Sequence, residues 1–147
     1  MRKIEYIFID SDRQNDDVKS RRNDVPNFGY HYVVSPEGLV IHPTDISLTA
    51  DIIQGPVYDP DKYNKCSIFI RYCGSIRPEV WLINPDTSRA AIMAQRAALL
   101  QLLVHLRKHF PEAKILGVSE IDGRELYCKN IIVSDAMNVL RRELSEL

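Results

Sequence analysis

The chain has 147 residues, of which 45% are hydrophobic and 27% are charged, and this is typical of one globular domain spanning residues 1–147. Its formal net charge is −1, whereas a nucleic-acid or anionic-membrane surface needs a concentrated basic field. We therefore expect neither nucleic acid nor a membrane among its partners.

Charges interrupt residues 1–10, and no apolar run there is long enough for a signal peptide or a membrane span. We therefore expect an intracellular, cytoplasmic protein. The cysteines are odd in number and lack Cys-x-x-Cys spacing, which predicts reduced, mostly buried thiols rather than disulfides or a structural zinc site. These cysteines are Cys66, Cys73 and Cys128.

The hydrophobic pattern predicts a strand, a polar segment and then a hairpin. Residues 4–10 carry apolar side chains on both faces, as an interior strand does. Residues 11–28 are polar and rich in turn formers, which allows a loop or a short helix. Strands at 30–34 and 39–41 flank Ser-Pro-Glu-Gly, a tight turn in which Gly38 can adopt a positive φ.

Residues 42–65 contain three prolines and several Asp and Asn residues, which indicates a long surface loop of the kind that borders binding grooves. A strand is predicted at 67–72, and a short apolar segment at 81–83 precedes a helix boundary at 84–88. The next helix runs from 88 to 110 and is stopped by a proline. Its apolar face follows the helical period and comprises Ile92, Leu99, Leu103, Leu106 and Phe110.

Residues 114–118 predict the last strand, and Ser134 is expected to cap a terminal helix. The sum is a single α/β domain with a central mixed sheet of about five strands, the long helix packed on one face, and the C-terminal helix. The inner stripe of that terminal helix is predicted to be Met137, Leu140, Leu144 and Leu147.

Several short motifs occur in a recognisable order. Ile-Phe-Ile-Asp-Ser at 7–11 is followed by Asn-Phe-Gly-Tyr-His-Tyr-Val-Val at 27–34 and by the Pro-Glu-Gly turn at 36–38. Tyr-Asn-Lys-Cys-Ser-Ile at 63–68 and Lys-Ile-Leu-Gly at 114–117 come later. The order resembles the type-2 N-acetylmuramoyl-L-alanine amidases, the family of phage lysozyme amidases and peptidoglycan recognition proteins, over nearly the whole chain. Gly-Tyr-His with its turn is the most specific part.

The resemblance implies a zinc-dependent amidase, but the residues at the three zinc-ligand positions differ. Asp10 stands where the family has a His at the end of the opening strand, and Val118 stands where it has a His after the last strand. The third ligand, a Cys or Asp, falls on Ile131 if the match is anchored on Asp135. Moving the match by three residues would place Cys128 there, and both placements stay open.

A catalytic zinc of this class needs three protein ligands and a water molecule, whose pKa it lowers to about 7. Val118 has no lone pair to donate, and Asp10 with Cys128 would supply only two ligands. We therefore expect no metal and no other cofactor in this chain, although active members of the family require zinc. We therefore expect the chain to be an amidase-like domain without catalytic activity.

Parts of the family's site are retained or replaced by polar residues. Tyr30 matches a tyrosine that assists the reaction in active members, and Lys129 matches a lysine that stabilises the transition state, so both are vestigial catalytic candidates. Ordinary packing of Tyr30 and solvation of Lys129 are the alternatives. The candidates for binding substrate in the groove are Asp10, Asp51, Asn64 and Glu120.

These candidates have alternative explanations too. Asp10 and Glu120 would make the groove acidic and suited to an ammonium group or a cation, unless they are separate surface carboxylates. Asn64 can instead shape a turn. Among the histidines, His105 and His109 have the i, i+4 spacing of metal ligands, but their place in the last helical turn favours solvent and the helix dipole. His31, beside Tyr30, is expected in the core or at the groove rim.

Two functions remain open. The first is a binding module that holds a muropeptide or other peptidoglycan fragment, or a protein partner, in the vestigial groove. The second is an active amidase whose metal is held by Asp10, Cys128 and a third, unidentified ligand. A phage or mobile-element origin rests on analogy with the family alone.

Overall fold

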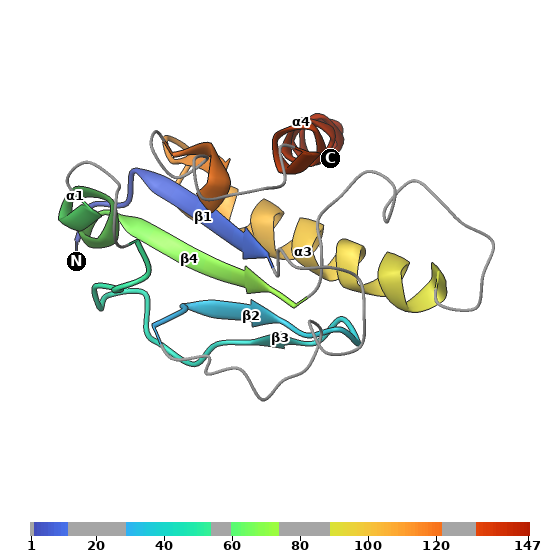
Figure 1. Ribbon diagram of the computed structural model, residues 1–147, viewed down its shortest axis with the longest axis horizontal. Coiled ribbons are helices and arrows are strands. Elements are labelled where there is room, and N and C mark those ends of the chain that lie inside the picture. Colours follow the sequence, from blue (N-terminus) through green and yellow to red (C-terminus); the bar gives the residue numbers. More distant parts are fainter. Residues whose placement is uncertain (1, 12–28, 54–59, 74–88, 122–131) are drawn as a thin grey trace.

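The computed structural model describes residues 2–11, 29–53, 60–73, 89–121 and 132–147 (Figure 1). The predicted segment 81–83, the helix boundary at 84–88 and the polar stretch 12–28 lie outside the described residues. The elements are β1 (Tyr6–Ser11), β2 (Tyr32–Val34), β3 (Val40–Ile41), α1 (Pro60–Lys65), β4 (Ser67–Tyr72), α3 (Arg89–His109), β5 (Lys114–Gly117), the 3-10 turn η2 (Val118–Glu120) and α4 (Ile132–Ser145).

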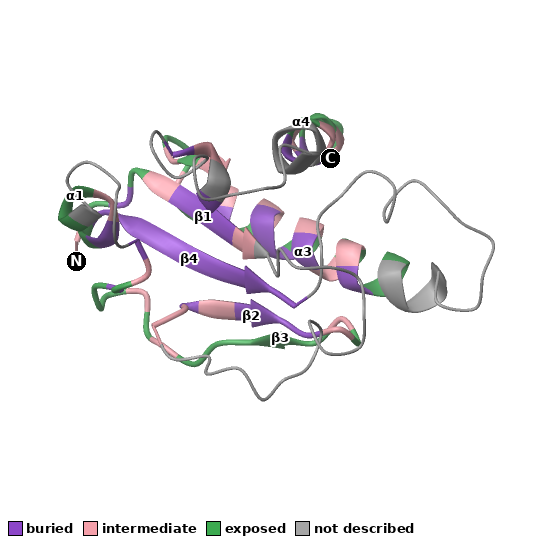
Figure 2. Cartoon of the chain, viewed as in Figure 1, coloured by how far each residue is buried: buried purple, intermediate pink, exposed green. Residues whose placement is uncertain are grey.

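The strands form one five-stranded mixed sheet in the order β3-β2-β4-β1-β5 (Figure 1). β1 runs parallel to both β4 and β5, β2 runs parallel to β4, and β3 closes a hairpin against β2. β4 is buried along its whole length (Figure 2) because it lies inside the sheet and is covered on both faces. The predicted α/β class with a central mixed sheet is confirmed.

Alternate residues of β1 feed two separate hydrophobic clusters, because successive side chains of a strand point to opposite faces. Ile7 and Ile9 belong to the first cluster, which packs the sheet against α3 and α4. Phe8 belongs to the second cluster, on the opposite face of the sheet. Its buried members are Phe8, Ala50, Ile53, Phe69, Val118 and Ile121.

α3 forms the long predicted helix, and its basic last turn suits the negative end of the helix dipole. Leu99, Leu103 and Leu106 are buried against the sheet as the periodicity predicts. Near the start of the helix, buried Gln95 donates from Nε2 to the carbonyl oxygen of Cys73 at 2.6 Å. This bond fastens α3 to the chain just beyond β4.

α4 packs beside α3 over the first cluster. Arg96 of α3 pairs with Glu143 of α4, and Arg107 donates from Nη1 to the carbonyl oxygen of Leu144 at 3.0 Å. Both helices therefore cover the same face of the sheet. Among the described residues, the opposite face is covered by the loop that carries Ala50 and Ile53, by Tyr63 of α1, and by Val118 and Ile121.

Three sequence expectations need correction. Residues 60–65 form α1 rather than the end of a loop, because a proline fits the first helical position and Asp61 suits the first turn. Ser134 lies within α4, which begins two residues earlier at Ile132 despite the low helix propensity of β-branched residues. Leu147 follows the end of α4 and is exposed, so it does not extend the buried stripe of Met137, Leu140 and Leu144.

Cys66 and Cys73 are buried, as expected, and Cys128 lies outside the described residues. Within the described part of the chain, none of the helices combines the length and apolar character needed to cross a lipid bilayer.

The β2–β3 turn depends on Gly38, whose φ is +88°. A Cβ at this position would lie 3.0 Å from the carbonyl oxygen of Ala94 in α3. We expect Gly38→Ala to lower the free energy of unfolding by about 1–3 kcal/mol, measured by urea denaturation. Gly38→Asn separates the two causes, because asparagine tolerates a positive φ but keeps the contact. An unchanged denaturation midpoint for the alanine variant would contradict this account.

Candidate functional site

Parallel strands bring the sequence candidates to one edge of the sheet. β1, β4 and β5 run in the same direction, so their carboxyl ends lie together, and Ile9 is in register with Gly117. Asp10 follows Ile9, and Val118 follows Gly117. The first two positions implied to bind zinc are therefore neighbours at the carboxyl edge, where ligands of open α/β sheets bind.

Asp10 and Tyr30 are in direct contact. The Tyr30 hydroxyl donates a hydrogen bond to Oδ2 of Asp10 at 2.7 Å. Asp10 has the same strand parity as Phe8, so its side chain lies on the face of the second cluster, against which Tyr30 also packs. Two residues that are twenty positions apart in sequence thus form a polar pair on the face opposite α3.

Sequence reasoning missed Arg71, which lies beside this pair. Asp10 of β1 is in register with Arg71 of β4, and strand parity puts both on the face of Phe69. Arg71 is only 3% exposed. The available signal was a charged residue within the otherwise apolar strand Ser-Ile-Phe-Ile-Arg-Tyr. Its placement beside Asp10 depends on the strand register, which the sequence alone does not give.

Val118 contributes an aliphatic surface to this edge. It begins η2 directly after β5, is 3% exposed and packs in the second cluster. Its side chain has no atom that can coordinate a cation. The alternatives for the third position, Cys128 and Ile131, lie outside the described residues, as does Lys129.

Residues 50–53 form a wall of the candidate site, next to the Asp10–Tyr30 pair. Hydrogen bonds from Asn64 of α1 hold this wall in place. The Asn64 amide is buried; its Oδ1 accepts from the backbone N–H groups of Ile53 at 2.9 Å and Ile52 at 3.2 Å, and its Nδ2 donates to the carbonyl oxygen of Ile53 at 2.9 Å. Asp51 is exposed on this segment. The side chain of Ile52 lies close to the position that a Cβ on Gly29 would occupy. The wall is therefore next to Gly29, the residue before Tyr30.

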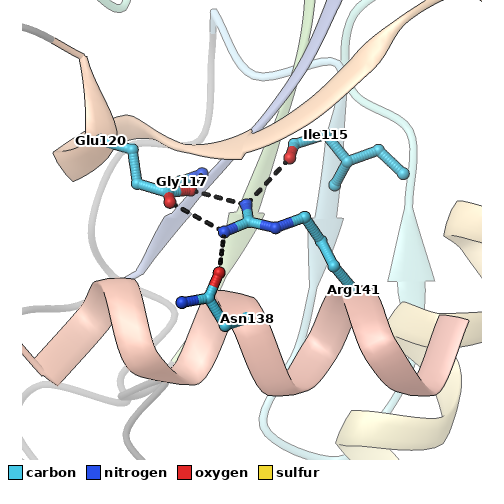
Figure 3. Close-up of polar contacts among 5 residues, drawn as sticks. All are labelled: Ile115, Gly117, Glu120, Asn138 and Arg141. Atoms are coloured by element: carbon cyan, nitrogen blue, oxygen red, sulfur yellow. Dashed lines mark hydrogen bonds and ion pairs between the residues drawn. The ribbon is translucent and has the colours of Figure 1, made fainter.

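The remaining candidate, Glu120, is bound by α4 (Figure 3). Its Oε1 accepts a hydrogen bond from the backbone N–H of Gly117 at 2.7 Å, and the guanidinium of Arg141 donates to both carboxylate oxygens, at 2.8 and 2.9 Å. Arg141 also donates to the Ile115 carbonyl oxygen and to Asn138. Two-point arginine–carboxylate pairs are strong and directional, so this network fixes the turn after β5 against α4.

The histidines divide into buried and exposed groups. His31 is completely buried at a bend just before β2. The predicted strand at 30–34 therefore begins later, at Tyr32, and His31 lies in the core with its ring stacked on Phe69 of the second cluster. His105 and His109 are exposed at the end of α3, with ring centroids 4.6 Å apart. Across the described ranges, no three His, Cys, Asp or Glu side chains are grouped so that they could hold a metal ion.

No family model matches the sequence, and no curated protein matches it. Among solved structures, the chain is similar to the N-acetylmuramoyl-L-alanine amidase LysC from Clostridium intestinale URNW, with a TM-score of 0.60 and 13% sequence identity. The alignment covers 97% of this chain and 87% of that chain. The likeness establishes that the sheet, the long helix and the terminal helix have the fold of this amidase.

Proposed function

We propose that this chain is an amidase-fold binding module that holds a peptidoglycan fragment against the face carrying Asp10 and Tyr30, without hydrolysing it. The solved neighbour is an N-acetylmuramoyl-L-alanine amidase, which supports the ligand class. The observation that carries the proposal is the Tyr30–Asp10 hydrogen bond beside the aliphatic side chain of Val118.

The donor set at this edge does not suit a catalytic zinc. Such a metal requires three protein ligands with lone pairs, and Val118 contributes none. A carboxylate and a phenol instead provide an acceptor and a polar ring for the amide, hydroxyl and ammonium groups of a muropeptide.

The exposed carboxylate of Asp51 adds a second negative group on the adjoining wall. Asp10 and Asp51 offer carboxylate acceptors to the amide, hydroxyl and ammonium groups of a stem peptide, while Arg71, in register with Asp10, offsets part of their negative charge. The other two substrate-binding candidates have supporting roles. Asn64 holds residues 50–53 by hydrogen bonds, and Glu120 fixes the turn after β5.

Calorimetry with a purified disaccharide–peptide muropeptide tests the proposal. We expect saturable binding that weakens roughly 10- to 100-fold in Asp10→Asn, which removes a charged hydrogen-bonding group, and about 2- to 10-fold in Tyr30→Phe. Two control variants should bind as the parent does: Asp61→Asn on exposed α1, and Tyr32→Phe, whose ring packs against the first cluster on the opposite face.

Two results would overturn the proposal. The first is the absence of muropeptide binding while the protein binds a protein partner through the same face. The second is stoichiometric zinc in the purified protein together with release of stem peptide from cell-wall fragments, which would make the chain an active amidase with a non-standard metal site. Metal analysis and a peptide-release assay with added Zn²⁺ measure the second result directly.

A further inference from the structure

His31 connects three separate segments of the molecule. Its backbone N–H donates to the carbonyl oxygen of Phe69 at 2.9 Å, and its ring Nδ1 accepts the backbone N–H of Phe69 at 3.0 Å. Nε2 lies 2.8 Å from the carbonyl oxygen of Leu48. The imidazole therefore ties β4 to the loop that runs from 42 to 53.

These contacts fix the protonation state of the ring. Nδ1 faces an N–H donor and must be the unprotonated acceptor, so Nε2 carries the hydrogen and donates it to Leu48. An imidazolium would carry a hydrogen on both nitrogens and would oppose its Nδ1–H to the N–H of Phe69. Only the neutral ring satisfies both partners.

Arg2 adds a positive charge at the same point. Its Nη2 lies 3.0 Å from Nε2 of His31, and because Nε2 carries the hydrogen in this tautomer, the contact brings two donors together and is not a hydrogen bond. Its Nε donates to the carbonyl oxygen of Ile46 at 3.0 Å. The same guanidinium donates to the carbonyl oxygen of Lys65 at the end of α1. Charging His31 would thus place two cations in contact inside a buried site, where their repulsion is weakly screened.

We infer that His31 is an acid-sensitive clamp: in its neutral form it holds the loop 42–53 on the second cluster, and when protonated it releases that loop. Burial lowers the pKa of His31, and the charges of Arg2 and His42 lower it further, while the bond to Leu48 and the exposed carboxylate of Asp45 act in the opposite direction. Among the described residues these are the charged and titratable groups that act on the ring.

The released segment is the wall of the candidate site. Ala50 and Ile53 are buried in the second cluster, and Ile52 abuts the residue before Tyr30. Opening the loop therefore uncovers the second cluster and removes the wall that adjoins Asp10 and Tyr30. The conformational step stands without any ligand, whereas its effect on muropeptide binding rests on the proposed function.

The change in clamp opening with pH follows from the difference in proton binding between the closed and open states. Because the pKa of His31 is lower in the folded chain than its ordinary value near 6.5, the unfolded or opened state binds more protons below that value. The clamp is fully effective above pH 6.5 and weakens as the pH falls from there through the folded-state pKa. Opening should increase up to tenfold for each pH unit in that window.

Hydrogen exchange followed by mass spectrometry at pH 7.5 and pH 5.0, corrected for intrinsic exchange rates, measures the opening. We expect peptides covering 44–53 and the amide of Phe69 to exchange faster at pH 5.0 than at pH 7.5, by up to about thirtyfold, and peptides from the middle of α3 to change little. His31→Gln, which cannot be charged, should remove the pH dependence. His105→Gln, an exposed histidine of α3, should retain it.

Two further measurements keep the test decisive if the His31 variant folds poorly. An NMR titration of the parent protein should give a His31 pKa below its ordinary value near 6.5, and Arg2→Gln should raise the His31 pKa. Equal protection of 44–53 at both pH values, or a His31 pKa at its ordinary value, overturns the clamp. Loss of muropeptide binding at every pH would instead count against the proposed function, because the exchange experiment contains no ligand.

Discussion

Replacing Phe8 with alanine is expected to lower the free energy of unfolding by about 3–5 kcal/mol. Phe8 is completely buried in β1, and its ring centroid lies 5.4 Å from those of Tyr6 and Phe69 and 5.9 Å from that of Tyr63. Truncation removes the ring shared by these aromatic contacts and leaves a cavity in the second cluster, on the face of the sheet. The backbone of β1 cannot move to fill it, since hydrogen bonds to β4 and β5 fix the strand on both sides.

Urea denaturation followed by circular dichroism measures this loss. Leu39→Ala is the matched control, because it also truncates a large apolar side chain, but one that is 65% exposed. We expect the control to change stability by no more than about 0.5 kcal/mol. If Phe8→Ala lowered the free energy of unfolding by less than about 1 kcal/mol, the second cluster would not be a packed core.

Replacing Asn64 with alanine is expected to cost about 2–4 kcal/mol, because the backbone N–H and carbonyl of Ile53 would lose their shared partner in a buried site. Asn64→Asp keeps the acceptor for the N–H groups but turns a charged oxygen toward the Ile53 carbonyl. The aspartate variant should therefore recover stability, relative to the parent at the same pH, as acid protonates the new carboxyl and restores a donor.

The control for both variants is Gln101→Ala, which removes an exposed amide from the outer face of α3. It should leave the denaturation midpoint almost unchanged. If the aspartate variant is as stable as the parent at neutral pH, the Asn64 side chain does not donate to Ile53, and the wall of the candidate site is held in another way.

The strands and the long helix could be predicted because their evidence is local. β4 coincides with the predicted residues 67–72, and the spacing of Leu99, Leu103 and Leu106 identifies the buried face of α3. α1 was missed because its six residues are too short for a periodic signal, although Pro60 and Asp61 suit a helix start. Helix α4 begins at Ile132, two residues before the predicted cap at Ser134.

The candidate site was predictable only in part. The resemblance named Asp10 and Tyr30 as candidates, whereas the hydrogen bond that joins them depends on the tertiary structure and has no local signal in the sequence. The position of Arg71 beside Asp10 depends on the register of two strands separated by most of the chain's first half. The contact of His31 with Arg2 likewise depends on tertiary packing, and no motif in the sequence signals it.

The place of β1 within the sheet governs how a nascent chain must fold. β1 leaves the ribosome first, yet Tyr6 pairs with Ser67 and with Lys114, whereas the β2–β3 hairpin pairs residues that are close in sequence. At the usual speed of translation its second partner follows on the order of ten seconds later. During that interval Ile7 and Phe8 of β1 lack the partner strands that flank them in the finished sheet, so β1 can take its final place only after β5 has been synthesised.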